Sequence, residues 1–250
     1  MSGPADHPLE PMLRKLGYYA PLDEADRAAL LALPYQLKTL EARQDIVREG
    51  EHPTFSCVML SGYSFRYKLV AGGARQIVSI HMRGDWVDLQ NSLLRTADHS
   101  VETLVRSDVA LVPIEAVLAL AFERPSVGFA LWYGSLVEGS VFREWVANVG
   151  RRDARTSMAH LLCELALLMK VAGVGKQTDY EMPLSQEQLA DCLGLTPVHV
   201  NRTIRLLENE QLIKRSTSRT ITIGDWEKLA DAGDFDSRYL HLHGDDTVYV

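Results

Sequence analysis

The spacing of apolar residues along the chain predicts strands first and helices afterwards. From about Gln36 to Ile114, short segments alternate apolar and polar residues and end at turn residues, as YSFRYKLV does before Gly72-Gly73. Alternation of this kind is typical of half-buried strands, and paired glycines between two such runs favour a hairpin. Many short strands at regular spacing predict a β-sandwich or a barrel.

A helical spacing replaces the alternation near Glu115, where EAVLALAFE predicts a short helix. From Ser126 to roughly Gly150, the sequence SVGFALWYGSLVEGSVFREWVANVG predicts a long helix that is apolar on nearly every side. A helix with two apolar faces needs two packing partners, so we expect the barrel on one face and a second copy of this helix on the other. Burial inside a single chain is the alternative. The residues expected at the dimer contact are Phe129, Trp132, Leu136, Gly139 and Val146.

The stretch from Leu184 to Ile213, LSQEQLADCLGLTPVHVNRTIRLLENEQLI, predicts two short amphipathic helices joined by a tight turn. Ser185 followed by Gln188 forms a capping box, and Gly194 supplies the left-handed residue that ends the first helix. Thr196 caps the second helix, which begins at a proline. This order is typical of a DNA-reading helix-turn-helix, and an unrelated helical hairpin is the alternative.

One face of the second helix is apolar, which leaves the opposite face for DNA. Val200, Ile204 and Leu207 recur at helical spacing and predict the inward face. An arginine such as Arg202 can donate two hydrogen bonds to guanine, and Thr196 at the helix start suits a phosphate oxygen. The residues of the helix pair expected to contact DNA are Ser185, Thr196, Val198, His199, Asn201, Arg202 and Arg205.

A two-stranded wing is predicted after the helix pair. The sequence LIKRSTSRTITI has an apolar start, a polar tip and an alternating end. Arg215 and Arg219 flank the tip, where each could hold a DNA phosphate, and a solvated turn is the alternative reading of either one. Helix, turn, helix and wing in this order predict a winged helix.

Composition and charge are compatible with this picture. Apolar residues make up 46% and charged residues 24%, as in an ordinary soluble globular protein. The net charge is −7, but residues 151–224 carry 10 Lys and Arg against 8 Asp and Glu, so the predicted DNA-binding segment has a positive balance. No apolar run reaches the ~18 residues that span a bilayer, and the start MSGPADHPLEPML lacks the layout of a secretory signal.

The chain has three cysteines, Cys57, Cys163 and Cys192. Their odd number and wide spacing argue against a disulfide framework and favour a reducing cytoplasm.

From about Leu22 to Trp226 this layout resembles the Crp/Fnr transcription regulators. The resemblance rests on the helix pair, on the glycines of REGE, LSGYSFRY and RGDWVDL, and on the long helix before GRRDAR. It implies an α+β fold with an N-terminal double-stranded β-roll (a jelly roll), a long dimerisation helix and a C-terminal winged helix-turn-helix. The implied domains are a sensor β-roll at 1–124, the dimerisation helix at 125–150, the DNA-binding domain at 151–228 and an acidic tail at 229–250.

The resemblance also implies the partners. These are a second copy of the chain, double-stranded DNA with two-fold-related half-sites, RNA polymerase and an unidentified small-molecule effector, with no membrane. The family's base-reading positions fall at Val198, His199 and Arg202. Arg202 matches the arginine common in the family, whereas Val198 replaces the usual glutamate, so the half-site need not be the familiar one.

Cyclic AMP is not expected to be the effector. In the family's cyclic-nucleotide binders, a Gly-Glu holds the ribose and an Arg-Ser holds the cyclic phosphate, whereas this chain has Asp88 as the nearest carboxylate and His99-Ser100 in place of Arg-Ser. A neutral histidine is a poor substitute for a charged arginine opposite a phosphate. If another small effector binds, the expected polar contacts are Arg83, Asp88, Asn91, His99 and Ser100.

Two alternatives concern other sensors and enzymes. The first 56 residues hold no cysteine cluster for iron–sulfur sensing, and a haem sensor would use His81, His99 or Cys57. A cupin-type metal enzyme would need about three histidines and a carboxylate in the barrel, and only His52, His81 and His99 are available there. His241 and His243 form a pair only in the acidic tail. We therefore expect no catalytic residue, no metal and no cofactor.

Overall fold

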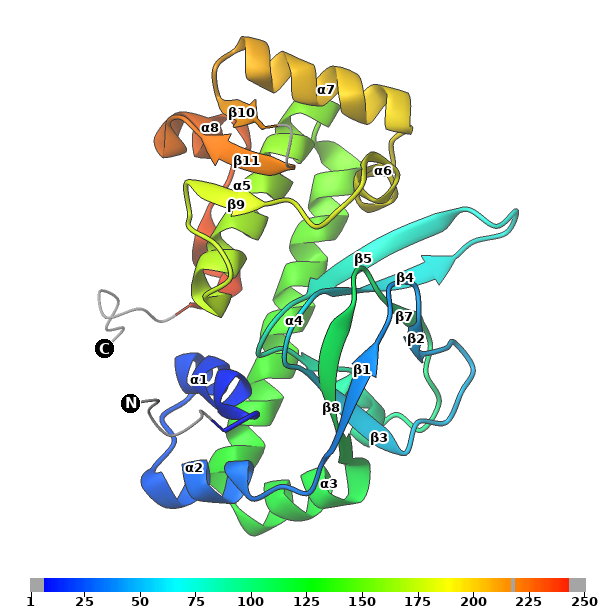
Figure 1. Cartoon of the computed structure of the whole chain (residues 1–250), viewed down its shortest axis with the longest axis vertical. Helices are drawn as coiled ribbons and strands as arrows, with labels where there is room; N and C mark the ends of the chain where they lie inside the picture. The colour runs from blue at the N-terminus through cyan, green and yellow to red at the C-terminus, as the bar shows by residue number, and fades with distance from the viewer. Residues whose placement is uncertain (1–6, 217–218, 243–250) are drawn as a thin grey trace. The chain divides into compact units, whose positions relative to one another are not determined.

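A computed structural model describes residues 7–216 and 219–242 (Figure 1). Within them the chain forms two compact units. The first comprises residues 7–66, 80–139 and 241–242, and the second comprises residues 67–79, 140–216 and 219–240. The division falls within the longest helix, α4 (Pro125–Arg151), which contributes residues to both.

Two four-stranded sheets form the β-roll, with strand orders β1-β8-β3-β6 and β2-β7-β4-β5. In the first sheet, β8 pairs antiparallel with β1 on one side and with β3 on the other. The alternating segments form strands, as predicted, and this arrangement confirms the β-roll that the resemblance implies. The strands are β1 (Gln36–Leu40), β2 (Asp45–Val47), β3 (Phe55–Met59), β4 (Ser64–Leu69), β5 (Arg75–His81), β6 (Trp86–Val87), β7 (Ser100–Thr103) and β8 (Ser107–Pro113).

Helices cover one side of the first sheet. Leu13 of α1 (Glu10–Tyr19), Leu30 of α2 (Glu24–Leu31), Val117 of α3 (Ile114–Glu123) and Val127 of α4 pack in one core with Val112 of β8. Burial of these side chains removes apolar surface from water and supplies the main stabilisation of the unit.

A glycine is required where β3 turns into β4. Gly62 has a φ of +75°, and a Cβ there would lie 2.2 Å from the Ser107 hydroxyl oxygen. Any larger residue would therefore be both strained and in collision with β8.

The second unit contains a winged helix. It consists of α5 (Ala154–Ala172), α6 (Gln186–Leu193), α7 (Pro197–Asn209) and a three-stranded sheet of order β10-β11-β9. The wing strands β10 (Ile213–Arg215) and β11 (Thr220–Ile223) pair antiparallel, and β11 also pairs with β9 (Asp179–Glu181). The helix-turn-helix and the wing thus follow in the predicted order.

The chain after the wing folds back onto α5. It forms α8 (Trp226–Ala232) and the short 3-10 helix η2 (Ser237–Leu240), whose Tyr239 ring stacks on His160 with centroids 5.8 Å apart. The Tyr239 hydroxyl donates to Glu164, which also accepts a 2.7 Å hydrogen bond from the Trp145 indole. The sequence predicts only an acidic tail from residue 229, of which 243–250, including His243, lie outside the described residues.

None of the helices in the described ranges combines the length and the apolar character needed to cross a membrane.

Candidate nucleic-acid interface and the β-roll network

Side-chain caps fix the start of each helix in the pair. The Ser185 hydroxyl accepts from the Gln188 amide N–H at 3.2 Å, and the Gln188 side chain accepts from the Ser185 N–H at 2.8 Å. Gly194 ends α6 with a φ of +64°. Thr196 Oγ1 then accepts from the His199 N–H at 3.2 Å at the start of α7. Ser185 and Thr196, two of the expected DNA contacts, therefore already have capping roles.

The buried and exposed faces of α7 separate as the spacing predicts. Val200, Ile204 and Leu207 are buried. Val198 is 72% exposed, and on the same outer surface Asn201 is half-buried. A surface pocket lies along this helix and contains three of the expected DNA contacts; its lining is His199, Arg202, Thr203, Arg205, Leu206 and Asn209. The exposed part of α7 thus offers imidazole and guanidinium donors.

The two wing arginines have different surroundings. Arg215 forms a two-point ion pair with Glu208, at 2.9 Å from Nε and 2.7 Å from Nη2. This pairing lowers the pKa of the Glu208 carboxyl. Arg219 is exposed and has a φ of +67°, next to the tip residues 217–218, which are not described. A phosphate would compete with Glu208 for Arg215.

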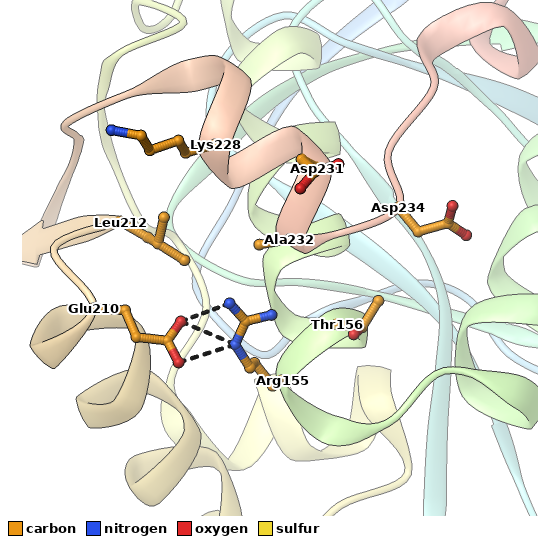
Figure 2. A pocket seen from close by; sticks show the side chains of 8 residues that line it. All are labelled: Arg155, Thr156, Glu210, Leu212, Lys228, Asp231, Ala232 and Asp234. Atoms are coloured by element: carbon orange, nitrogen blue, oxygen red, sulfur yellow. Dashed lines mark hydrogen bonds and ion pairs between the residues drawn. The ribbon is translucent and has the colours of Figure 1, made fainter.

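A second acidic residue near the end of α7 also holds an arginine. Glu210 accepts from Arg155 of α5 at 2.6–3.1 Å (Figure 2). The pair lines a surface pocket of mixed charge that also includes Thr156, Leu212, Lys228, Asp231, Ala232 and Asp234. Neither Glu208 nor Glu210 is predicted from the sequence, because their arginine partners lie on other elements.

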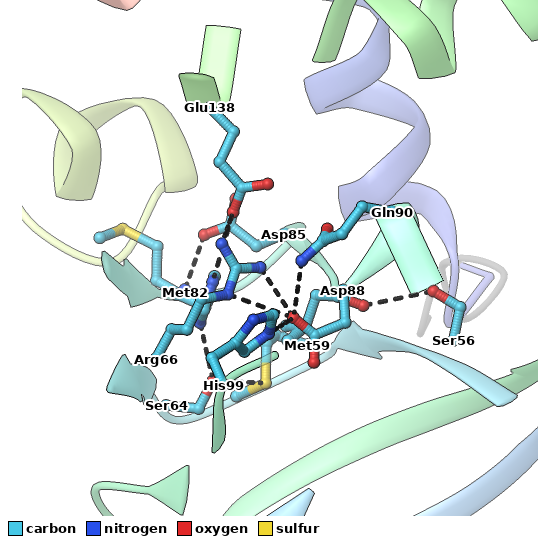
Figure 3. Close-up of polar contacts among 12 residues, drawn as sticks. Ser56, Met59, Ser64, Arg66, Met82, Asp85, Asp88, Gln90, His99 and Glu138 are labelled. Carbon is cyan, nitrogen blue, oxygen red and sulfur yellow. Dashed lines mark hydrogen bonds and ion pairs between the residues drawn. The ribbon is translucent and has the colours of Figure 1, made fainter. Parts of the chain in front are cut away.

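A buried ionic cluster occupies the β-roll (Figure 3). Arg66 of β4 is 2% exposed and donates from Nη2 and Nε to Asp88 Oδ1 at 2.8 and 3.2 Å. Its Nη1 donates to Glu138 of α4 at 2.5 Å. His99 Nε2 lies 2.8 Å from the same Asp88 oxygen. We call Arg66, Asp88, His99 and Glu138 the Arg66 network.

The electrostatics of the network favour charged carboxylates. Burial alone would raise the pKa of Asp88, but the hydrogen bond from His99 and the charge of Arg66 lower it to about 2. For Glu138, burial is the largest single cause and would raise the pKa, but the charges and hydrogen bonds of Arg66 and His81 together lower it. Burial lowers the pKa of the nearby His81, which lies 3.8 Å from Glu138. Sequence analysis did not single out Arg66 or Glu138.

The five residues expected to contact an effector differ in burial and in hydrogen bonding. Asp88 and His99 are bonded to each other, and Asn91 is buried nearby on η1 (Leu89–Ser92). Among the described residues, no group pairs with Asp88 Oδ2 or Asn91 Nδ2. Arg83 is half-buried, and the half-buried Ser100 accepts from the Glu49 N–H at 3.0 Å.

The expected dimer residues form a stripe along α4. Phe129, Trp132, Leu136 and Val146 are 52%, 63%, 55% and 73% exposed, and Gly139 is half-buried. Successive steps of three, four, three and seven residues place them on one face of the helix, in the spacing of a coiled-coil seam. We call these five residues the α4 stripe.

The histidines and the cysteine considered as haem or metal ligands contact other protein groups or are buried. His52 contacts the Arg95 carbonyl oxygen at 3.0 Å, and His81 contacts the Ser64 hydroxyl at 3.3 Å. Cys57 is buried, and burial raises the pKa of its thiol. Within the described residues, no group of three or more His, Cys, Asp or Glu side chains is arranged to hold a metal ion.

Comparisons with known proteins agree with this architecture. The family profile described as "Crp-like helix-turn-helix domain" matches residues 157–232. The transcriptional activator protein FnrL of Cereibacter sphaeroides is 26% identical over 227 residues, which cover 89% of this chain and 90% of FnrL. The nitrogen fixation regulation protein FixK of Azorhizobium caulinodans is 27% identical over 172 residues, which cover 69% of this chain and 68% of FixK.

Solved structures share the fold. FixK2 from Bradyrhizobium japonicum aligns with a TM-score of 0.72 and 22% identity over 80% of this chain and 98% of FixK2. A CooA mutant from Carboxydothermus hydrogenoformans aligns with a TM-score of 0.65 and 16% identity, over 80% of this chain and 88% of that one. These solved structures show the fold. The helix-turn-helix profile over residues 157–232 and the relatives that match most of the chain's length support a Crp/Fnr-family regulator.

Proposed function

We propose that the chain is a homodimeric transcription regulator that recognises a two-fold DNA site through α7. The observation that carries this proposal is the capped α7, which buries its apolar face and exposes Val198, His199, Arg202 and Arg205. The printed names of FnrL and FixK describe regulators, which supports the same role here. The proposed role requires no catalysis, and RNA polymerase remains an expected partner by family resemblance.

Within α7, Arg202 is proposed to contact a base directly. Arginine donates two hydrogen bonds to the guanine O6 and N7 atoms in the major groove, which fixes one base pair. Arg219 of the wing is proposed to contact a phosphate, as its exposed position permits. Arg215 can contribute only if DNA displaces it from Glu208.

Dimerisation is proposed to occur through the α4 stripe. Four large apolar side chains on one face of a helix would be exposed in a monomer, and a second copy of the same helix would bury them. A two-fold dimer presents two copies of α7, so the half-sites should lie about one helical turn apart, ~10 base pairs or about 34 Å.

The β-roll is proposed not to be a cyclic AMP receptor. Asp88 stands nearest to the position of the expected ribose carboxylate, and it is already bonded to Arg66 and His99. No arginine stands at His99-Ser100 to hold a cyclic phosphate.

Selection of bound sites from a random DNA library tests the proposal. The full chain should enrich a two-fold sequence with half-sites about one turn apart. Arg219→Ala should weaken all duplexes alike and reduce the salt dependence of binding by about one unit. Failure to enrich any two-fold site would refute the regulator proposal.

A further inference from the structure

Arg66 is a buried charge whose position needs an explanation. Its side chain is 2% exposed, although arginine keeps its charge under all ordinary conditions. Burying a charge is costly unless oppositely charged groups surround it. The carboxylates of Asp88 and Glu138 supply this compensation; Asp88 follows β6, and Glu138 belongs to α4. The arginine therefore depends on both partners being in place.

The guanidinium connects the wall of the roll to α4. Its Nη2 and Nε groups point to Asp88, which follows β6, whereas its Nη1 group points to Glu138 (Figure 3). Because the guanidinium is planar and rigid, these three bonds define where Glu138 can lie relative to the roll. His99 supports the arrangement by bonding the same Asp88 oxygen. Arg66 thus fixes the direction from which α4 meets the roll.

Glu138 lies within the part of α4 that carries the stripe. Leu136 and Gly139 belong to the stripe, and the Glu138 side chain between them points to Arg66. Holding Glu138 against the roll therefore fixes the rotation of α4 about its axis. The stripe is presented to a second copy only in that rotation.

A ligand that replaced Arg66 in this network would face a specific obstacle. It would leave the buried carboxylate of Asp88 and the partly buried carboxylate of Glu138 without their cation unless the ligand were itself positively charged. The chain's own side chain thus already occupies the position that joins the roll to α4.

We propose that Arg66 and Glu138 are positioning residues that orient α4 for dimerisation and DNA binding without any small-molecule ligand. This inference rests on the proposed function, because DNA binding is its readout. Beyond the proposed function, it assigns the orientation of α4 to the ion pair between Arg66 and Glu138.

The test compares three full-length proteins without added ligand: wild type, Glu138→Gln and Glu144→Gln. Glu138→Gln removes the charge on the α4 side of the network and nearly keeps the shape. Glu144→Gln is the matched control on the same helix, where it removes a 2.7 Å ion pair with Arg152. Native mass spectrometry of each protein first shows whether a small molecule has co-purified.

Dimerisation is measured by sedimentation, and affinity is measured on the duplex recovered by selection. Ligand-free wild type should dimerise and bind. Glu138→Gln should lose at least about tenfold in both measurements, while its near-ultraviolet circular dichroism stays that of a folded roll. Glu144→Gln should stay within about twofold of wild type, and Arg66→Lys, which keeps the charge but not the planar fork, should fall between the two.

Three results would overturn the inference. Wild-type affinity in Glu138→Gln would show that the pair does not position α4, and an unfolded roll in that variant would make the pair a stability element only. If wild type binds DNA only together with a recovered ligand, the Arg66 network is insufficient to orient α4 without that ligand. Wild type that enriches no DNA at all refutes the proposed function instead, and this outcome is distinguishable because dimerisation is measured independently.

Discussion

Glu164 gives the sharpest prediction about stability, because its carboxyl group is buried and its described hydrogen-bond partners carry no positive charge. It is 2% exposed, and it accepts hydrogen bonds from the Trp145 indole and the Tyr239 hydroxyl. Burial raises the pKa of Glu164 to about 7, although these two hydrogen bonds act in the opposite direction. The folded protein therefore keeps Glu164 protonated up to a higher pH than the unfolded chain does.

The magnitude follows from the difference between the folded and unfolded pKa values. A rise from 4.5 to about 7 corresponds to about 3 kcal/mol of differential stability. Since the folded value lies above the unfolded value, the contribution is fully present below about pH 4.5. It is lost as the pH rises through about 7. Raising the pH from about 4.5 to about 7 should therefore destabilise this unit, with no further loss from Glu164 at higher pH.

Urea unfolding of wild type and Glu164→Gln across this pH range measures the effect. Glutamine keeps the shape of the side chain and can accept from Trp145, but it does not titrate. Between about pH 5 and about pH 8, the variant should gain about 2 to 3 kcal/mol relative to wild type. The neighbouring ionisable side chains of His160, Glu144 and Tyr239 are present in both proteins, so the difference between the two curves reports the Glu164 carboxyl together with its coupling to these neighbours. Parallel stability curves for the two proteins would refute the reasoning.

Three further predictions concern the dimer, the effector and the roll. Trp132→Glu places a charge in the α4 stripe and should give a monomer of 27.9 kDa by sedimentation at micromolar concentration, whereas Phe122→Glu, at a site 82% exposed on α3, should not. Calorimetry should show no micromolar binding of cyclic AMP, since each lost charge-assisted contact costs roughly 1.5–3 kcal/mol; a micromolar affinity would contradict the pairing of Asp88 with Arg66. Gly62→Ala should lower stability by about 1–3 kcal/mol in thermal denaturation. Gly72→Ala should lower stability less, because no atom lies within 4 Å of the Cβ position at Gly72. Equal losses in the two variants would contradict the predicted collision of the new Cβ with Ser107.

The helix pair could be predicted from sequence because its signals are local. Ser185 and Gln188 are three residues apart, and Gly194 ends α6 by its own conformation. The turn glycines and the alternating strands are similarly short-range, so the order of the elements could be read along the chain.

The Arg66 network could not be predicted because its contacts are long-range. Arg66 lies 22 residues from Asp88 and 72 residues from Glu138 along the chain. Alternation in SFRYKL suggests one outward face, but Ser64, Phe65 and Arg66 are all buried. The same reason applies to the C-terminal segment. Its acidic composition predicts only a tail, whereas the Tyr239 hydroxyl donates to Glu164 of α5.

The central claim is that α7 reads DNA sequence, and Arg202→Ala tests it most directly. The measurement is the affinity of wild type and variant for the selected duplex and for a scrambled duplex at the same salt concentration. The variant should lose roughly 1–3 kcal/mol on the selected duplex, relax its preference at one base pair and change little on the scrambled duplex. An equal loss on both duplexes would show that Arg202 contacts only the phosphate backbone and would contradict sequence reading by this residue.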